Sequence, residues 1–319
     1  MLPAGVQAAV LSRGYKRKSN GFQYVEPDSD AAFAGDEPLQ IKRKFPEVLV
    51  AVDKDRVEGC TRLAAETPGQ AGSDGRHCRP YGAPANCKFV GYLDRQSPGI
   101  IVLDDAFQYN KLRACLNIVL VDYNRPVWKD CLLPFGRLRD LPERLADADI
   151  VIITKCPADL GQEEREAISA KARKYLPEGS QKELPVLFTR IAYDTPRPVY
   201  AEGKARPFEG KEFVLFTGIA GDGPLAEHLA ESGRVVEHLR FADHHAYGAG
   251  DIARIAEAAR RHPDAVVATT EKDAQRIRDC RDLPAGLRER LVEFPIRAEF
   301  LLEEDRKLFE TKLFNLIKL

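Results

Sequence analysis

Two adjacent carboxylates at the end of an apolar run are the strongest candidates for chemistry in this sequence. Ile100–Leu103 is typical of a buried strand, and Asp104 and Asp105 follow it directly, with Gln108 three residues further on. Many nucleotide-binding folds present an acidic ligand to Mg²⁺ at such a place. A single aspartate after a strand is often the N-cap of the next helix instead. The pair therefore predicts a metal site, with a helix cap as the alternative.

Three further segments carry groups that could act on a substrate. Asp243–His245 sets two histidines beside a carboxylate, a combination that can orient a base or bind a metal. Ser12–Lys18 is either a solvated basic turn or a clamp for an anionic group, and Gly14 would permit close backbone approach. Gly35–Pro38, with sequence G-D-E-P, indicates by itself only a turn.

The apolar pattern predicts the elements that must position these residues. Short β-branched runs alternate with helical stretches, among them Glu163–Leu176 and a helix from Asp251 onward. We therefore predict a doubly wound α/β fold with a mostly parallel sheet, in which ligands bind beyond the carboxyl ends of the strands. The predicted strands are Ala8–Leu11, Val48–Val52, Ile100–Leu103, Asn117–Val121, Ile150–Thr154, Pro185–Phe188, Phe213–Thr217 and Ala265–Thr269.

Two segments interrupt this alternation. Thr67–Pro98 is rich in Gly, Pro and small polar residues, and we interpret it as a long inserted surface loop whose removal should leave folding intact. Tyr193–Gly210 is dense in Pro and Gly and has no apolar period, which favours a domain boundary there. The prediction is a first α/β domain over residues 1–200 and a smaller α/β domain over residues 201–319.

Composition excludes several classes of protein. With 319 residues, 44% apolar and 30% charged residues and a net charge of −1, the chain shows no basic stripe of the kind that binds nucleic acid. No apolar run reaches the roughly 18 residues that cross a bilayer. The seven cysteines are odd in number and form no C-x-x-C pair, which favours reduced thiols. His77, Cys78 and Cys87 lack a fourth metal ligand at suitable spacing.

Ten segments, taken in order, resemble the lipid A disaccharide 4′-kinase family. That family transfers the γ-phosphoryl group of ATP to the 4′-hydroxyl of a tetraacylated glucosamine disaccharide, with Mg²⁺, at the cytoplasmic face of the inner membrane of Gram-negative bacteria. The resemblance implies a fold similar to P-loop NTPases with a smaller C-terminal domain. The segments are S-R-G-Y-K-R-K-S, G-D-E-P, V-D-K-D-R, L-D-D-A-F-Q, N-I-V-L-V-D-Y, L-L-P-F-G-R-L-R-D, I-I-T-K-C-P, F-T-G-I-A, F-A-D-H-H-A-Y and T-T-E-K-D-A.

The resemblance also implies roles for individual positions. Asp104 and Asp105 correspond to the acidic pair that engages Mg²⁺. Asp36 corresponds to the catalytic carboxylate, which would act with His244 to activate the acceptor hydroxyl. The remaining positions are expected near the phosphates and the lipid A disaccharide monophosphate: Ser12, Arg13, Tyr15, Arg137, Arg139 and His245.

One family feature has no counterpart in these residues. The family carries a glycine-rich loop upstream of S-R-G-Y, whereas no G-x-x-x-x-G-K-[ST] occurs in this sequence. We expect these 319 residues to bind Mg-ATP poorly and their sheet to have an unpaired edge where the first strand is missing. Two alternatives are a non-catalytic remnant that binds lipid or protein and, from D-H-H with Asp53 and Asp55, a two-metal phosphoesterase. The chain lacks the further His-rich segment of the latter class.

Overall fold

The chain divides into two compact units that are described separately. The computed structural model describes residues 7–65, 99–200, 210–219, 221, 223–243, 245–278, 280 and 283–317. Unit 1 comprises residues 1–191 and 298–319, and unit 2 comprises residues 192–297. The second domain predicted from sequence ran to residue 319, but the last residues return to unit 1. The predicted insertion, Thr67–Pro98, lies outside the described residues.

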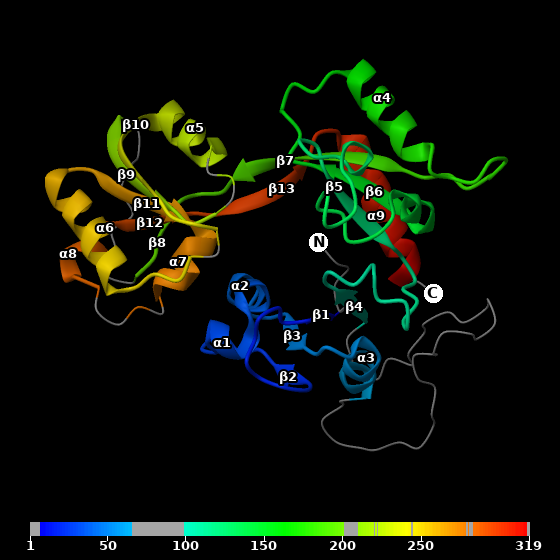
Figure 1. Cartoon of the computed structure of the whole chain (residues 1–319), viewed down its shortest axis with the longest axis horizontal. Coiled ribbons are helices and arrows are strands. Elements are labelled where there is room, and N and C mark those ends of the chain that lie inside the picture. Colours follow the sequence, from blue (N-terminus) through cyan, green and yellow to red (C-terminus); the bar gives the residue numbers. More distant parts are fainter. Residues whose placement is uncertain are drawn as a thin grey trace. The chain divides into compact units, whose positions relative to one another are not determined.

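The first sheet of unit 1 has helices on both faces (Figure 1). Alternate residues of its strands point to opposite sides, so Leu11 and Ala51 pack against α3 (Arg56–Ala65), whereas Val50 and Val52 pack against α1 and α2. All strand pairs are parallel except β2 with β3. In sheet order the strands are β2 (Gln23–Tyr24), β3 (Leu49–Val52), β1 (Ala8–Ser12) and β4 (Ile100–Leu103), and the helices are α1 (Ala31–Ala34) and α2 (Asp36–Lys44).

The second sheet of unit 1 is covered by α4 (Gln162–Arg173) and α9 (Glu303–Ile317) on opposite faces. Val151 and Ile153 face the α4 side, and Ile150 and Ile152 face the α9 side with Phe300 and Phe309. This burial explains why the C-terminal helix belongs to unit 1. The strands in order are β13 (Ile296–Phe300), β7 (Val186–Tyr193), β6 (Ile150–Thr154) and β5 (Ile118–Asp122), and two short 3₁₀ helices, η1 (Val127–Lys129) and η2 (Pro142–Asp147), lie between β5 and β6.

Each sheet of unit 1 ends in a strand with an exposed apolar side chain. Among the described residues, β4 pairs only with β1 and β5 pairs only with β6. Val102 on β4 is 50% exposed and Leu120 on β5 is 65% exposed. The sequence predicted one unpaired edge in this domain, and among the described residues β4 and β5 each lie at an edge of their sheet.

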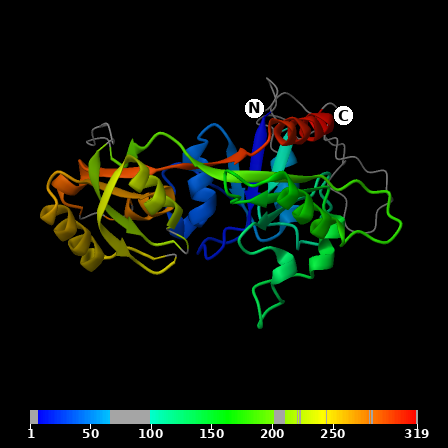
Figure 2. The same cartoon turned by 90° about the horizontal axis from the view of Figure 1, so that it is seen from above.

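Unit 2, at the left of Figure 2, is a five-stranded sheet with helices on both faces. Phe213 and Leu215 pack against α5 (Gly223–Ser232), whereas Phe216 and Val267 pack against α6 (Ala249–Arg261) and α7 (Glu271–Arg278). The strands in order are β10 (Gly233–Arg240), β9 (Lys211–Thr217), β11 (Val266–Thr270), β12 (Leu291–Phe294) and β8 (Arg197–Pro198), and a short helix α8 (Ala285–Arg288) precedes β12. Only β8 is antiparallel to its neighbour.

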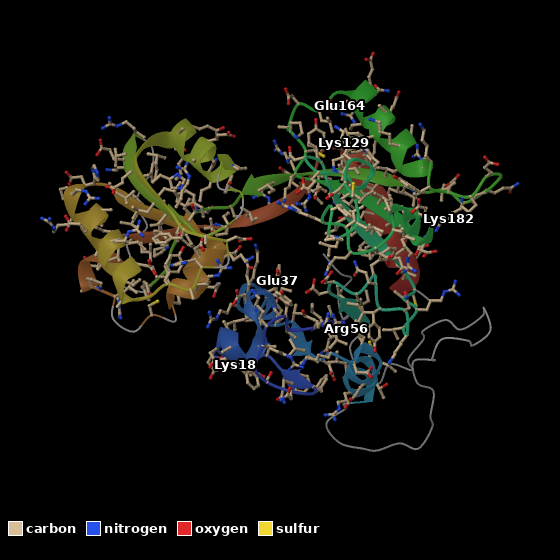
Figure 3. The ribbon with its side chains drawn as sticks, viewed as in Figure 1. Lys18, Glu37, Arg56, Lys129, Glu164 and Lys182 are labelled. Carbon is tan, nitrogen blue, oxygen red and sulfur yellow. The ribbon has the colours of Figure 1, made fainter. Side chains whose placement is uncertain are left out.

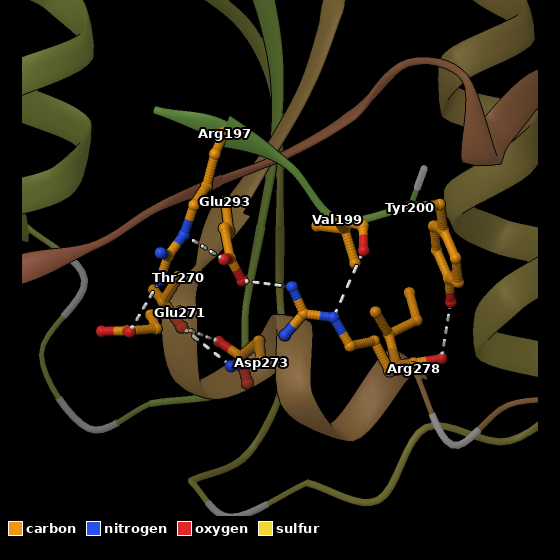
Figure 4. Close-up of polar contacts among 9 residues, drawn as sticks. Arg197, Val199, Tyr200, Thr270, Glu271, Asp273, Arg278 and Glu293 are labelled. Atoms are coloured by element: carbon orange, nitrogen blue, oxygen red, sulfur yellow. Dashed lines mark hydrogen bonds and ion pairs between the residues drawn. The ribbon is translucent and has the colours of Figure 1, made fainter. Parts of the chain in front are cut away.

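Ion pairs with two buried glutamates hold β8 against the rest of unit 2 (Figure 4). Arg197 Nε lies 2.7 Å from Glu293 Oε1, and Arg197 Nη2 lies 3.2 Å from Glu271 Oε1. Arg278 donates to the other oxygen of Glu293 at 3.0 Å. Both glutamates are almost fully buried, so each needs these partners to remain charged inside the protein.

The predicted α/β class is confirmed. Each of the eight predicted strands overlaps an observed one, and most strand pairs are parallel. Strands that the pattern missed are short or partly polar, as in Gly233–Arg240 at the edge of unit 2. No helix in the described part of the chain is long and apolar enough to cross a membrane.

Candidate active site

Three neighbouring strands of unit 1 end in polar residues at the same edge of the sheet. Ser12 ends β1, and Asp53 and Asp104 follow β3 and β4. Because β3, β1 and β4 are parallel and adjacent, these residues lie together. Ser12 Oγ donates to Asp104 Oδ2 at 3.0 Å, and the Asp53 amide donates to the Ser12 carbonyl at 3.0 Å. Ser12 and Asp104, which are far apart in the sequence, are therefore in direct contact.

Arg56 holds the two acidic loops together, and sequence reasoning did not single it out. This first residue of α3 is only 2% exposed. Its guanidinium donates to the carbonyl oxygens of Asp53 at 2.5 Å and Asp104 at 3.0 Å. Burial lowers the pKa of Arg56, and the charge of Asp104 opposes that shift. Figure 3 labels Arg56 beside α3. In the sequence, Arg56 is the last residue of V-D-K-D-R, one of the segments that resemble the kinase family.

Asp105 has a different partner from its neighbour. Its φ of 46° places it in the left-handed region, which few residues other than glycine adopt. Arg139 donates to both carboxylate oxygens, at 3.0 and 2.6 Å. The hydrogen bonds from Arg139, aided by the charges of Arg56 and Arg13, lower the pKa of Asp105. Asp105 is therefore paired with Arg139 in this structure, and a shared metal site of Asp104 and Asp105 stays a prediction.

The residues at this sheet edge fit a magnesium ion that is shared with a phosphate. Among the described residues no three acidic, histidine or cysteine side chains converge on one point. Mg²⁺ needs no such group, because it commonly uses one or two carboxylates together with water and substrate phosphates. Asp104 with the Ser12 hydroxyl offers such a set, and Asp53 Oδ2 beside them is buried without a hydrogen-bond partner in the described structure. No helix begins between Asp104 and β5 in the described chain, which removes the N-cap alternative.

The backbones of the loop Ser12–Tyr15 and the segment G-D-E-P are in close contact. Gly14 and Gly35 both have positive φ, at 67° and 91°. A β-carbon on Gly35 would lie 3.3 Å from the α-carbon of Gly14 and 3.3 Å from the carbonyl oxygen of Tyr15, so only glycine permits this approach. Asp36 is the first residue of α2, where a carboxylate is favoured by the free N–H groups of the helix. The S-R-G-Y and G-D-E-P segments, which are separate in the sequence, are therefore neighbours in the structure.

The basic residues of the Ser12–Lys18 segment divide into structural and accessible ones. Arg17 is buried and donates to Ser19 Oγ at 2.9 Å and to the Gly21 carbonyl at 2.6 Å, so it shapes the loop. Arg13 and Tyr15 are exposed, and the charge of Arg13 acts on Asp105. An anion clamp in this segment would therefore rest on Arg13.

The two histidines of D-H-H stand differently in the structure. His244 lies outside the described residues. His245 Nε2 lies 2.9 Å from Asp251 Oδ2, and its ring stacks on Phe241 with 5.0 Å between centroids. Asp251 also accepts the Gly248 amide at the start of α6. These contacts give His245 a structural role in unit 2, and its proximity to substrate stays a prediction.

Three motifs of unit 2 meet at the buried carboxylate of Asp273. Its Oδ2 accepts the Gly218 amide at 2.9 Å and the Thr270 hydroxyl at 2.7 Å, and its Oδ1 accepts from Arg276 at 3.1 Å. Burial and the charge of Asp273 raise the pKa of the nearby Tyr247. The F-T-G-I-A turn could have bound an anion through backbone N–H groups, but its Gly218 amide is already taken.

Asp55 and Arg137 have hydrogen bonds of their own. Asp55 Oδ1 accepts the amides of Val57 and Glu58, so its carboxylate caps the start of α3, and its amide donates to Asp53 Oδ1 at 3.0 Å. Arg137 is exposed and its amide donates to Asp130, whereas Arg139 contacts the acidic loop, and the proximity of Arg137 to substrate stays a prediction.

Comparison with known proteins gives this site a context. The family model described as tetraacyldisaccharide-1-P 4′-kinase matches residues 1–318. A tetraacyldisaccharide 4′-kinase of Phocaeicola vulgatus is 32% identical, over 100% of this chain and 80% of its own length. That of Parabacteroides distasonis is 36% identical, over 95% of this chain and 76% of its own. The chain belongs to the tetraacyldisaccharide 4′-kinase family.

A solved structure shares the fold of this family member. The structure of LpxK from Aquifex aeolicus, described as an apo form in complex with ATP, covers 98% of this chain with a TM-score of 0.62. The chain covers 79% of that protein at 23% identity, a level that supports the fold alone. The resemblance to the kinase family that the ten motifs indicated is thus confirmed, whereas the roles of single residues stay predictions.

Proposed function

We propose that this chain carries the acceptor and metal-binding side of a tetraacyldisaccharide 4′-kinase. The reaction transfers the γ-phosphoryl group of ATP to the 4′-hydroxyl of a tetraacylated disaccharide 1-phosphate, a precursor of lipid A. The family match over residues 1–318 carries the proposal. The strand-end cluster of Ser12, Asp104 and Asp105 with three arginines supports it, because phosphoryl transfer depends on positioning and on stabilising negative charge.

Asp104, with the Ser12 hydroxyl beside it, would hold Mg²⁺ at this edge. The ion, when bound with ATP, neutralises charge that develops on the phosphoryl oxygens. Arg139 is held in one orientation by the two hydrogen bonds to Asp105, and Arg13 lies close enough to add its charge. These arginines would bind the anionic groups of ATP or of the disaccharide monophosphate.

Asp36 and His244 would activate the acceptor hydroxyl. A sugar hydroxyl is a poor nucleophile at neutral pH, so a base that accepts its proton during transfer accelerates the reaction. A carboxylate near its ordinary pKa of about 3.9 is a weak base, whereas an imidazole near about 6.5 is well matched to neutral pH. Asp36 belongs to unit 1, and residue 244 belongs to unit 2.

ATP binding would require a glycine-rich loop like that of the family, which this sequence does not contain. We expect weak ATP affinity for the 319 residues alone, and an active enzyme when such a loop precedes β1. The protein would work as a peripheral protein on the cytoplasmic face of the inner membrane, where its lipid substrate resides.

Titration calorimetry with Mg-ATP on the chain, with and without a glycine-rich family segment fused ahead of Met1, tests this proposal. Micromolar affinity of the unextended chain would contradict the expected need for that loop. An extended chain that binds ATP but phosphorylates no tetraacyldisaccharide at high enzyme concentration would favour the alternative of a non-catalytic remnant.

Substitutions in the extended chain test the proposed base. Asp36→Ala and His244→Ala should each lower kcat by about 10²-fold or more, and the double variant should be little worse than the worse single one, because the two groups act as one unit. KM for ATP should change less. Retention of normal kcat by His244→Ala together with its loss in His245→Ala would assign the role to the other histidine.

A further inference from the structure

The connection between β5 and β6 exposes an uninterrupted apolar run. Cys131, Leu132, Leu133, Pro134 and Phe135 are all exposed, with Leu133 at 62% and Phe135 at 93%. Figure 2 shows this green-teal connection projecting from the rest of unit 1. Single exposed apolar residues are ordinary, but five in succession on a projecting tip indicate a surface that contacts something apolar.

Basic residues flank this apolar tip. Between residues 125 and 139 the only acidic residue is Asp130, whose carboxylate is largely covered and faces Arg125. The same stretch holds four basic residues within a chain whose net charge is −1, namely Arg125, Lys129, Arg137 and Arg139. An apolar tip with a basic margin is complementary to a bilayer that contains anionic lipids.

Most backbone N–H groups in and beside the tip are hydrogen-bonded within the protein. The amides of Leu133 and Leu138 donate across the loop, those of Phe135 and Gly136 donate to the Leu132 carbonyl, and Pro134 has no N–H. The Arg137 amide donates to the Asp130 carboxylate at 3.2 Å. Transfer of a free N–H into hydrocarbon costs several kcal/mol, and here every N–H from residue 133 to residue 138 is paired.

The tip is also preformed and joined to the acidic loop. A β-carbon on Gly136 would lie 2.2 Å from the Cys131 carbonyl oxygen, so the tight closure of the loop requires glycine. Arg139, directly after the loop, makes the two hydrogen bonds to Asp105. Insertion of this tip into a bilayer would therefore hold the strand-end cluster close to the lipid surface.

We propose that the tip Cys131–Phe135 inserts into the headgroup and upper acyl region of an anionic bilayer, with Arg125, Lys129 and Arg137 contacting lipid phosphates. This inference rests on the proposed function, because contact with a bilayer is useful to an enzyme whose substrate carries four acyl chains. The binding itself needs no catalysis. A failure of lipid binding is therefore distinguishable from a failure of kinase activity.

Co-sedimentation with phosphatidylethanolamine–phosphatidylglycerol vesicles tests the insertion. The double variant Leu133→Ser/Phe135→Ser should bind about tenfold or more weakly than the wild-type chain. The matched control Phe45→Ser/Leu308→Ser removes a phenylalanine and a leucine exposed elsewhere in unit 1 and should bind like wild type. Lys129→Gln/Arg137→Gln should weaken binding to these vesicles but not to phosphatidylcholine vesicles.

Fluorescence quenching locates the tip in the bilayer. The chain has one tryptophan, Trp128, so Phe135→Trp in a Trp128→Phe background places a single indole at the tip. Lipids brominated near the headgroup should quench this indole and leave an indole at Phe45→Trp in the same background unquenched. Far-UV circular dichroism confirms that each variant is folded.

Three outcomes would overturn the proposal. The first is a wild-type chain that does not bind the anionic vesicles. The second is a tip double variant that binds the anionic vesicles as well as wild type. The third is loss of self-association in the double variant with unchanged vesicle binding, measured by analytical ultracentrifugation.

Discussion

Arg56 and Arg139 contact the same acidic loop under opposite conditions of burial. Arg56 is 2% exposed and its guanidinium donates to two backbone carbonyls. The Arg139 side chain is 59% exposed and pairs with the carboxylate of Asp105, whose side chain is 52% exposed. Water replaces the partner of an exposed group more readily than the partner of a buried one. The two arginines should therefore serve stability and binding, respectively.

Urea unfolding should separate these roles. Arg56→Met leaves buried carbonyls without donors and should lower the free energy of unfolding by about 2–4 kcal/mol. Arg139→Gln removes an exposed pair and should change it by less than about 1 kcal/mol. Equal losses in the two variants would show that the exposed pair is structural.

At the scale of elements, the buried Asp273 organises one end of unit 2. It joins the turn after β9 to the start of α7, and a β-carbon on Gly218 would lie 3.0 Å from both Asp273 Oδ1 and the Tyr247 hydroxyl. No atom within 4 Å would meet a β-carbon on Gly250, which lies in the first turn of α6. An added methyl group would therefore be crowded at Gly218 and unhindered at Gly250.

Gly218→Ala and Gly250→Ala should change stability in opposite directions. The first forces apart a packed, hydrogen-bonded cluster and should cost about 1–3 kcal/mol. The second adds a methyl group to an open helical position and should stabilise by roughly 0.5–1 kcal/mol, because alanine loses less backbone entropy than glycine. Thermal unfolding of both variants checks the signs. Stabilisation by Gly218→Ala would mean that the cluster has room that the structure does not show.

At the scale of the whole molecule, unit 2 has the features of an independent folding unit. Its two ends are adjacent, since the Asp194 amide donates to the Pro295 carbonyl at 2.9 Å and Arg297 pairs with Asp194. It has its own apolar clusters on both faces of its sheet. The C-terminal helix α9 instead completes unit 1, where Asp305 accepts the Phe188 amide at 2.9 Å.

Residues 192–297 expressed alone should therefore fold cooperatively. Residues 201–319, the domain predicted from sequence, should be less stable or aggregate. That fragment lacks Arg197, which pairs with two buried glutamates, and it exposes the apolar face of α9. Circular dichroism melts and size-exclusion chromatography compare the two. Greater stability of residues 201–319 would contradict the division of the chain described above.

The sequence by itself determined the class of fold and the family. Buried strands such as Ile150–Thr154 are local apolar runs, and a local signal can be read without knowing their neighbours. The positions of Ser12 and Asp104 at strand ends follow from the same runs. Ten ordered motifs indicated the kinase family, which the comparison over residues 1–318 confirmed.

Only the tertiary structure decided which partner each polar residue takes. Asp104 and Asp105 are identical in type and adjacent, yet strand order places Ser12 beside the first, and the second pairs with Arg139 from 34 residues further along the chain. The role of Arg56 and the return of α9 to unit 1 likewise depend on contacts between segments far apart in the chain. Such contacts are fixed by strand order and packing, which leave no local pattern in the sequence.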